Sequence, residues 1–192
     1  MDLNIGSIHV FASIDWRVLE VKDGQALLIS EKILEMQAYN VEYVDITWKR
    51  CTLREYLNGE FYNSLGQDRH RIADSNNDNP NNPWYGTAGG STTVDKVFLL
   101  SLDEVCRHLG DGASTGNLSR KGSTGNNYYI TDKNNAARVS KYGNVAYWWW
   151  LRSPGYYGDN AAIVYDDGRV FVGGLLVNND YGGVRPALRL NL

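Results

Sequence analysis

The side chains best suited to contact another molecule gather near the carboxyl end, between Gly155 and Gly183. Tyrosine gives a large contact area at a small entropic cost, and asparagine and aspartate give adaptable hydrogen bonds, as in antibody paratopes. The candidate ligand-binding residues on this basis are Tyr156, Tyr157, Asp159, Asn160, Tyr165, Asp166, Phe171, Asn178, Asn179, Asp180 and Tyr181. Ordinary turn-rich loops have the same composition, and this remains the alternative interpretation.

Acidic residues in the same segment allow a second hypothesis, a calcium-assisted carbohydrate-binding module that uses Asp159, Asp166 and Asp180. Elsewhere, the stretch that begins at Asp74 places oxygen-bearing side chains at alternate positions, as a calcium loop does. It has Asn79 where the sharp turn requires glycine, and Tyr85 where a bidentate glutamate belongs. We therefore expect no cofactor, with calcium as the one alternative.

The sequence contains only weak matches to known catalytic motifs. Residues 112–116 read Gly-Ala-Ser-Thr-Gly and match a nucleophile elbow, but that motif needs a strand before the serine and a helix after it. Here a predicted helix precedes it and a polar loop follows. The three histidines, His9, His70 and His108, are scattered, and no catalytic triad has a supporting context. We predict a non-catalytic protein, and a hydrolase with an unrecognised carboxylate pair ranks lowest.

Length and charge restrict the protein class. The 192 residues, 43% of them hydrophobic, can form one domain with a single core, and we predict one domain over residues 1–192. A net charge of −3 gives no basic footprint for nucleic acid. The longest apolar run, residues 145–151, is too short to span a bilayer, so no membrane insertion is expected. Residues 1–4 lack a cationic start, and no export signal is expected in this chain.

Two helices and an amino-terminal hairpin are predicted. Asp23-Gly24 joins the apolar runs 14–21 and 26–30 in a tight turn. Thr52 and Glu55 form a capping-box pattern before a helix over residues 53–65, whose apolar side chains recur at helical spacing. A short buried strand is predicted over residues 97–100. Ser101 and Glu104 then form a second capping-box pattern, which opens a helix that ends at Gly110. Cys51 and Cys106 are expected to be free thiols within this helical structure.

The remaining segments are predicted to be loops and strands. Residues 74–83 are so polar that they should run over the surface, and loops dominate 111–135. Strands over 161–164 and 169–172 flank a second Asp-Gly turn at Gly168. Residues 184–190 alternate as one strand with one buried face, and Pro186 favours an edge position. Consecutive tryptophans at 148–150 must alternate between the two faces of a strand.

Several sequence blocks, in a fixed order, span nearly the whole chain. They are Ile14-Asp-Trp-Arg-Val-Leu19, Trp48-x-x-Cys-Thr-Leu-Arg-x-x-Leu-Asn58, Tyr85-Gly-Thr87, Asp95-Lys-Val-Phe-Leu-Leu-Ser101, Trp149-Trp-Leu-Arg-Ser-Pro-Gly155, Ala161-Ala162, Asp167-Gly168 and Gly183-Val-Arg-Pro-Ala-Leu188. Together they resemble a bacterial and phage domain family of unassigned function. More distantly, the chain resembles the C-type-lectin-like fold in its formylglycine-generating-enzyme branch, in which a terminal Gly-Phe-Arg strand is similar to Gly183-Val-Arg185.

This resemblance implies an α+β fold with two main helices, antiparallel sheets, and first and last strands that lie near each other. The oxidase activity of the branch is not implied, because Cys51 opens a helix and Cys106 lies inside another. We predict that the 155–183 segment is exposed on a stable buried frame. The frame residues would be Trp16, Trp48, Trp149, Trp150, Arg152 and Arg185.

The same fold branch includes the variable proteins of diversity-generating retroelements, in which a reverse transcriptase randomises adenines near the 3′ end of the gene. Randomised asparagine codons give a restricted residue set without stop codons, and the 155–183 segment is drawn from that set. On this ground the candidate site also includes Ile163, Arg169, Leu175 and Leu176. The resemblance implies a protein or glycan partner on a cell surface, and a location on a phage virion or a bacterial surface.

Overall fold

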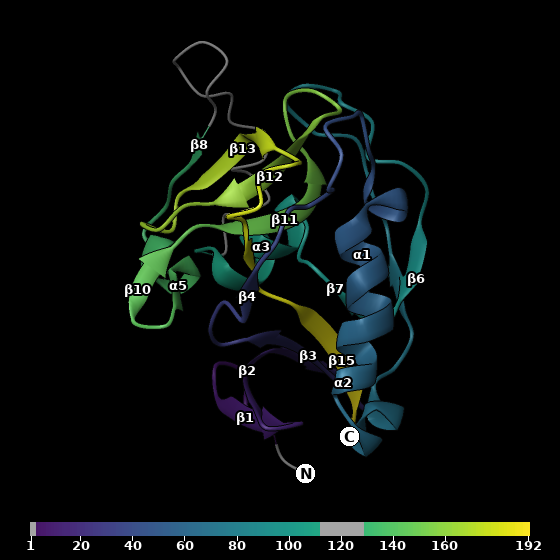
Figure 1. The fold of residues 1–192 in the computed structure, drawn as a ribbon. Helices are drawn as coiled ribbons and strands as arrows, with labels where there is room; N and C mark the ends of the chain where they lie inside the picture. The colour runs from purple at the N-terminus through teal and green to yellow at the C-terminus, as the bar shows by residue number, and fades with distance from the viewer. Residues whose placement is uncertain (1–2, 112–128) are drawn as a thin grey trace.

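The computed structural model describes residues 3–111 and 129–192 and shows a mixed α+β fold with antiparallel sheets and few helices (Figure 1). The serine pattern at 112–116 lies outside the described residues, as does most of the loop predicted over 111–135. One sheet has five strands, in the order β1 (Ile8–Phe11), β2 (Ile14–Lys22), β3 (Gln25–Ser30), β15 (Ala187–Asn191) and β7 (Val97–Phe98). The last strand thus lies in the sheet that contains the first.

A second sheet has six strands and carries most of the predicted site. Its order is β4 (Glu35–Met36), β14 (Gly183–Val184), β11 (Trp149–Pro154), β12 (Asn160–Val164), β13 (Val170–Leu176) and β8 (Tyr129–Ile130). Neighbouring strands in it are antiparallel, except that β11 and β14 run parallel. Two further pairs are β9 (Ser140–Tyr142) with β10 (Val145–Tyr147), and β5 (Ser75–Asn77) with β6 (Thr93–Asp95).

Both predicted hairpins are confirmed. Asp23 and Gly24 adopt positive φ angles of 51° and 75° between β2 and β3, which is the conformation that a two-residue hairpin turn requires. Gly168, with φ of 81°, lies in the turn between β12 and β13. A β-carbon at Gly168 would come within 1.9 Å of the Asn135 carbonyl oxygen, so this turn also packs against the short helix α5 (Asn135–Arg138).

The helix predicted over 53–65 is present as α1 (Thr52–Tyr56), a π-helical turn over residues 57–61, and α2 (Tyr62–Ser64). Its predicted capping box is wrong. The N-cap is Cys51, whose sulfur accepts from the Arg54 amide at 3.4 Å, and the Thr52 hydroxyl instead accepts from the Val41 amide at 3.1 Å. Burial raises the pKa of Cys51 to about 12, and both cysteines are buried free thiols, as expected.

The second capping box is confirmed. Helix α3 (Leu102–Leu109) begins after Ser101, whose hydroxyl accepts from the Glu104 amide while the Glu104 carboxylate accepts from the Ser101 amide. Cys106 lies on the buried side of this helix. Among the described residues, no helix is long and apolar enough to cross a membrane.

Residues 184–190 do not form one strand. Val184 belongs to the six-stranded sheet, whereas residues 187–191 form β15 of the five-stranded sheet, between β3 and β7. Pro186 is buried at the crossing point between the two sheets and is not at an edge. Its lack of an N–H group suits this position, because the chain leaves one ladder of hydrogen bonds there and enters another.

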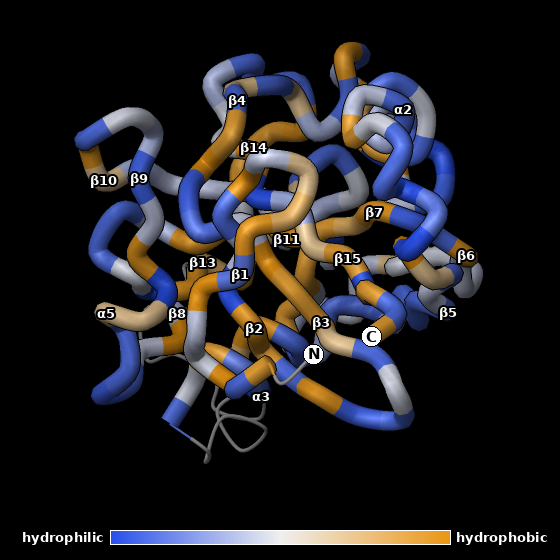
Figure 2. The backbone as a smooth tube through the Cα atoms, turned by 90° about the horizontal axis from the view of Figure 1, so that it is seen from below, coloured by the Kyte–Doolittle hydropathy of each residue, from blue (hydrophilic) through white to orange (hydrophobic). Residues whose placement is uncertain are grey.

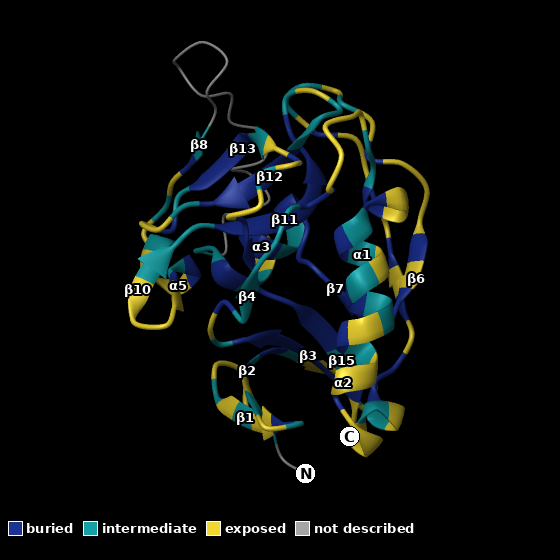
Figure 3. Cartoon of the chain, in the orientation of Figure 1, coloured by how far each residue is buried: buried dark blue, intermediate teal, exposed yellow. Residues whose placement is uncertain are grey.

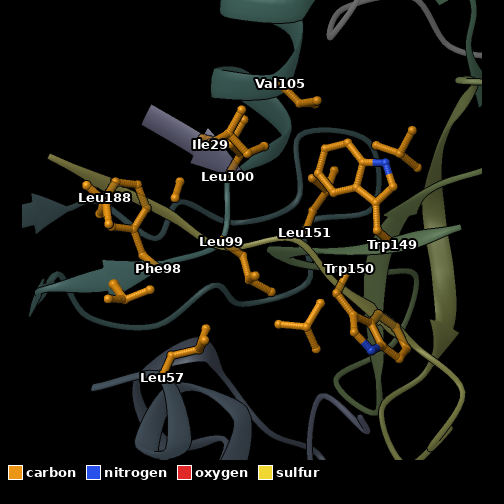
Figure 4. Close-up of a cluster of buried hydrophobic side chains, with 14 of the residues drawn as sticks. Ile29, Leu57, Phe98, Leu99, Leu100, Val105, Trp149, Trp150, Leu151 and Leu188 are labelled. Atoms are coloured by element: carbon orange, nitrogen blue, oxygen red, sulfur yellow. The ribbon is translucent and has the colours of Figure 1, made fainter. Parts of the chain in front are cut away.

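The predicted frame of tryptophans and arginines is buried. Trp149 and Trp150 point to opposite sides of β11 among leucine, isoleucine and phenylalanine side chains (Figure 4). Figure 3 shows burial along β11, β13 and β3, and Figure 2 shows hydrophobic residues in the strands of both sheets. Arg185 lies 5.0 Å from the Trp149 ring centroid, and Arg152 lies 5.7 Å from that of Phe98. Burial lowers the pKa of Arg185 to about 10.

The prediction that the polar stretch 74–83 runs over the surface is only partly correct, because its exposed residues alternate with buried ones over most of its length. Residues 75–77 form strand β5, which pairs with β6. Four side chains of the 74–83 stretch are buried: Ser75, Asn77, Asn79 and Asn82. Asparagine amides can be buried here because hydrogen bonds satisfy them, and the Asn82 amide donates to the carbonyl oxygens of Pro154 at 2.8 Å and Val172 at 3.1 Å.

Candidate functional site

A hollow of about 450 Å³ lies at the end of the hairpin formed by β12 and β13. We call it the tyrosine hollow, and its lining consists of Tyr43, Tyr156, Tyr157, Asp159, Asn160, Phe171, Gly173, Gly174 and Leu176. Six of the fifteen candidate residues are in this lining. Tyr157 is 61% exposed and Tyr43 is 58% exposed, so both rings are accessible from solvent.

A β-bulge shapes the hollow. The pairing of β12 with β13 shifts register between Ala161 and Ile163, and Gly174 on the opposite strand has a positive φ of 69°. A β-carbon at Gly174 would come within 2.0 Å of the Ala161 carbonyl oxygen, so only glycine fits. At Gly173 a β-carbon would lie 3.0 Å from the Phe171 ring. The two glycines leave open space that ordinary side chains would fill.

Buried hydrogen bonds hold the walls of the hollow. The Tyr156 amide donates to the Gly173 carbonyl oxygen at 2.8 Å, and this bond ties the turn after β11 to the bulge. Asn82 donates to β11 and β13, while its side-chain oxygen accepts from the Trp84 and Tyr85 amides. The Tyr85 ring therefore packs edge-on against Tyr156, with 4.6 Å between the centroids.

Another side of the hollow comes from the segment over residues 40–46, which follows β4 and contributes Tyr43 to the lining (Figure 1). Backbone hydrogen bonds fix it beside the site: the Asn40 amide donates to the Val177 carbonyl at 2.9 Å, and the Ile46 amide donates to the Gly158 carbonyl at 3.0 Å. These contacts bring Tyr43 next to Asp159, although 116 positions separate the two residues in the chain.

The electrostatic environment of the hollow is negative. The Asp159 carboxylate, first as a hydrogen-bond acceptor and then as a charge, raises the pKa of Tyr43, and Asp45 adds to this shift. The pKa of Tyr157 is also raised, mainly by the neighbouring Tyr156 hydroxyl and in smaller part by Asp159. Each shift shows that a negative charge on the phenol is disfavoured there. The Asp159 and Asp45 charges that raise the pKa of Tyr43 would attract a cation.

Three candidate residues form a separate group at the turn of the same hairpin: Tyr165, Asp166 and Arg169. The Arg169 guanidinium lies 5.0 Å from the Tyr129 ring centroid and 5.8 Å from that of Tyr165. Phe171 stacks on Tyr129 with 4.9 Å between centroids, and so joins this group to the hollow. Tyr129 was not among the candidates, although it completes the aromatic stack.

The remaining candidates have other positions. Asn178, Asn179, Asp180 and Tyr181 lie in the connection after β13, outside the lining of the hollow, and Leu175 is half-buried against the core. The prediction that Ile163 contacts a ligand is wrong, because this side chain is 0% exposed and packs in the core. Its strand, β12, lies between β11 and β13 in the six-stranded sheet, and its side chain belongs to the buried hydrophobic cluster.

Two of the acids proposed for calcium, Asp159 and Asp166, lie at opposite ends of β12. Asp159 precedes β12 and Asp166 follows it, so seven residue steps separate them, which is about 23 Å along an extended strand. Among the described residues, no group of three or more histidine, cysteine, aspartate or glutamate side chains could hold a metal ion. Asp45 and Asp159 line different hollows, so they do not form a facing pair within one cavity.

Three residues that shape the hollow were not predicted from the sequence: Tyr43, Asn82 and Tyr85. Asn82 and Tyr85 lie in or beside the stretch predicted to be a surface loop. Tyr43 had one usable signal, because the 40–46 segment contains Val41, Tyr43 and Val44 without a helical or strand period. Val41, Tyr43 and Val44 are exposed, and exposed apolar residues that gather on one surface indicate an interaction site.

Comparison with protein-family models matches residues 23–192 to the family described as "Domain of unknown function (DUF6273)". This match includes every segment that lines the hollow and begins just after β2. The chain belongs to this family. Neither the search of curated proteins nor the search of solved structures returned a match.

The glycine at the bulge gives a test of how this DUF6273 domain builds the hollow. We expect Gly174→Ala to reduce the free energy of unfolding by about 3 kcal/mol, because a positive φ and a close backbone contact both penalise a β-carbon. Gly143→Ala is the matched control, with φ of 60° and no neighbouring atom within 4 Å, and should reduce it by only about 1 kcal/mol. Urea unfolding measures both, and equal effects would contradict the proposed fit at Gly174.

Proposed function

We propose that this DUF6273 domain is a non-catalytic binding module that presents the tyrosine hollow to a protein or glycan partner. One observation carries the proposal: Tyr43 and residues from the 156–160 and 171–176 segments, which are distant from it in the sequence, together line one open hollow. Pockets that bind ligands combine apolar and aromatic walls with a few polar groups, and here Asp159 and Asn160 are those groups. The buried frame supports this surface, as a rigid scaffold supports functional loops.

Binding to defined probe sets tests this function. The labelled protein is applied to a printed glycan array, and the immobilised protein is used to select from a random-peptide display library. We expect a ligand whose binding weakens at least about tenfold in Tyr43→Ser and Tyr157→Ser, because exposed tyrosines that anchor a ligand contribute about 2 kcal/mol or more. Tyr142→Ser is the control, an exposed tyrosine on β9 that does not line the hollow.

Two outcomes contradict the proposal. One is that neither probe set yields a ligand. The other is that the selected ligands bind all three variants as well as the original protein. Unchanged thermal melts of the variants show that any loss of binding is local, and we expect unchanged melts because Tyr43, Tyr142 and Tyr157 are all exposed.

We further propose that the fold is C-type-lectin-like and that the 155–183 segment is diversified by a retroelement. Support for the fold comes from the pairing of β15 with β3 in the sheet that also contains β1. Support for diversification comes from the position of Tyr156, Tyr157 and Leu176 on an accessible surface. The genomic DNA tests it: we expect a near-copy of the 3′ end that differs only at adenines, beside a reverse transcriptase gene.

The burial of Ile163 adds a specific expectation about which codons differ between the two copies. Because Ile163 is fully enclosed, random residues there would create cavities or steric overlap in the core, so its codon should be identical in the two copies. The absence of a near-copy would reject diversification and would leave the binding module. A near-copy with frequent changes at the codon of residue 163 would contradict the position that the structure gives that side chain.

A further inference from the structure

We propose that the tyrosine hollow binds a quaternary ammonium group, such as the trimethylammonium head of choline or of trimethyllysine. This inference rests on the proposed function, because it names the ligand class of the same site. Rings around a cavity attract such cations through the negative potential of their faces, and aromatic cages are the usual way in which proteins recognise quaternary ammonium groups.

The aromatic lining provides the first argument. Four rings border the hollow, those of Tyr43, Tyr156, Tyr157 and Phe171. Tyr156 and Tyr157 lie 4.2 Å apart between centroids with an angle of 63° between their planes. Tyr85 packs behind Tyr156 at 82°. Rings at such steep angles form walls, and not the flat platform on which a planar sugar face or a base would stack.

The charge of the hollow provides the second argument. Asp159 belongs to the lining, and the residues that line the hollow include neither lysine nor arginine. Asp45 lies close enough to contribute to the raised pKa of Tyr43. A cation in the hollow would therefore be attracted by two carboxylates and would meet no lining residue of its own charge.

The third argument comes from the other end of the same hairpin. There Arg169 lies over the Tyr129 and Tyr165 rings, at 5.0 Å and 5.8 Å from their centroids, within the distance that cation–π attraction requires. The chain supplies its own cation to that aromatic group. The hollow has rings of the same kind and a carboxylate, and its cation would come from a ligand.

Hydrogen bonding selects the kind of cation. The Oδ1 atom of Asp159 is buried and has no hydrogen-bond partner within the described part of the chain, and the carboxylate already accepts from the Tyr43 hydroxyl, so a donor entering the hollow would compete with Tyr43 for the remaining oxygen. A primary ammonium brings three donors and a guanidinium brings five, and each loses hydrogen bonds to water on entry. A quaternary ammonium has no donor and loses none, which makes it the cation that suits this hollow.

Choline and its uncharged isostere test the proposal directly. Choline chloride and 3,3-dimethylbutan-1-ol have the same shape, but only choline is charged. We expect choline to bind at least tenfold more tightly in NMR titrations, with shifts at the amides of Tyr157, Asp159 and Gly174. Asp159→Asn and Tyr157→Leu should each weaken choline binding at least fivefold, whereas Tyr142→Leu on β9 should leave it unchanged.

Separate titrations distinguish the sources of the group. Phosphocholine represents a headgroup, and Nα-acetyl-Nε-trimethyllysine amide represents a modified protein. We expect the lysine derivative to bind more tightly, because Asp45 and Asp159 repel a phosphate. Saturable binding of either at the hollow supports the proposal.

Equal binding of choline and the alcohol, or choline shifts outside the hollow, would overturn the proposal. If the glycan or peptide probes still yield a ligand that depends on Tyr43 and Tyr157, only the ligand class proposed here is wrong. If those probes fail as well, the binding function of the hollow is also wrong. The two failures are therefore separable.

Discussion

Asp95→Ala is expected to reduce the free energy of unfolding by about 4 kcal/mol, because it leaves buried donors without an acceptor. The Asp95 side chain is fully buried and accepts four hydrogen bonds, from Trp48 Nε1 at 3.0 Å, Asn77 Nδ2 at 2.8 Å, Thr93 Oγ1 at 2.7 Å and Arg54 Nε at 2.6 Å. These donors come from the chain before α1, from α1 itself, and from β5 and β6. One carboxylate thus holds the helix to the adjacent strand pair.

Urea unfolding followed by tryptophan fluorescence measures this loss. For a slope of about 2 kcal/mol per molar urea, the midpoint should fall by about 2 M. Asp103→Ala is the control, because Asp103 pairs with Arg107 at a solvent-accessible position of α3 and should contribute less than about 0.5 kcal/mol. If the two variants unfold at the same urea concentration, the Asp95 network does not have the role inferred here.

Arg152→Lys is expected to reduce the free energy of unfolding by about 3 kcal/mol, although it keeps the charge. The guanidinium donates to the Leu99 carbonyl at 2.8 Å, to Asn79 Oδ1 at 3.3 Å and to the Asp78 carbonyl at 3.3 Å, and it forms an ion pair with Glu104. A lysine ammonium has three donors on one atom and cannot reach all these acceptors. The substitution should therefore loosen the contact between β11, α3 and the 78–79 segment.

Arg107→Lys, at an exposed ion pair of α3, is the matched control and should change the free energy of unfolding by less than about 0.5 kcal/mol.

The ion pair of Arg152 also predicts a pH dependence of the unfolding free energy. Burial alone would raise the pKa of Glu104, but the charge of Arg152 and hydrogen bonds from Arg152 and Ser101 outweigh burial and lower it. The stabilisation from ionised Glu104 is then complete above the unfolded pKa of about 4.3 and disappears as the pH falls through the folded pKa.

Urea unfolding between pH 3 and pH 7 checks this sign. The difference in unfolding free energy between the original protein and Glu104→Gln should be largest near neutral pH and should shrink in acid. A difference that stays constant over this range would contradict the proposed ion pair, as would Arg152→Lys unfolding at the same urea concentration as Arg107→Lys.

The correct predictions depend on short-range physics. Asp23-Gly24 specifies a hairpin because only two residues need positive φ angles, and Ser101 with Glu104 specifies a helix start because both partners lie within one turn. The predicted N-cap at Thr52 is wrong by one residue. Cys51 took the capping position there, and the Thr52 hydroxyl found a partner at Val41, outside the helix.

The wrong and partly correct predictions share a different cause. Residues 74–83 look like a surface loop because their side chains are polar, yet Asn77 and Asn82 are buried where distant carboxylate and carbonyl oxygens accept from their amides. Residues 184–190 look like one strand because their pattern alternates, yet the chain changes sheets at Pro186. In each case the partners come from other parts of the chain, which composition and periodicity do not reveal.

The sequence by itself determined the α+β class, the two principal helices, both Asp-Gly hairpins, the buried tryptophan and arginine frame, and the segment that contains most of the hollow. Only the tertiary structure separated Ile163 in the core from Tyr157 at the surface, and only it brought Tyr43 to Asp159. The physical reason is that a bulge at Gly174 and backbone hydrogen bonds from residues 40 and 46 build the hollow. Such contacts join segments more than a hundred residues apart, whereas sequence patterns report on neighbours.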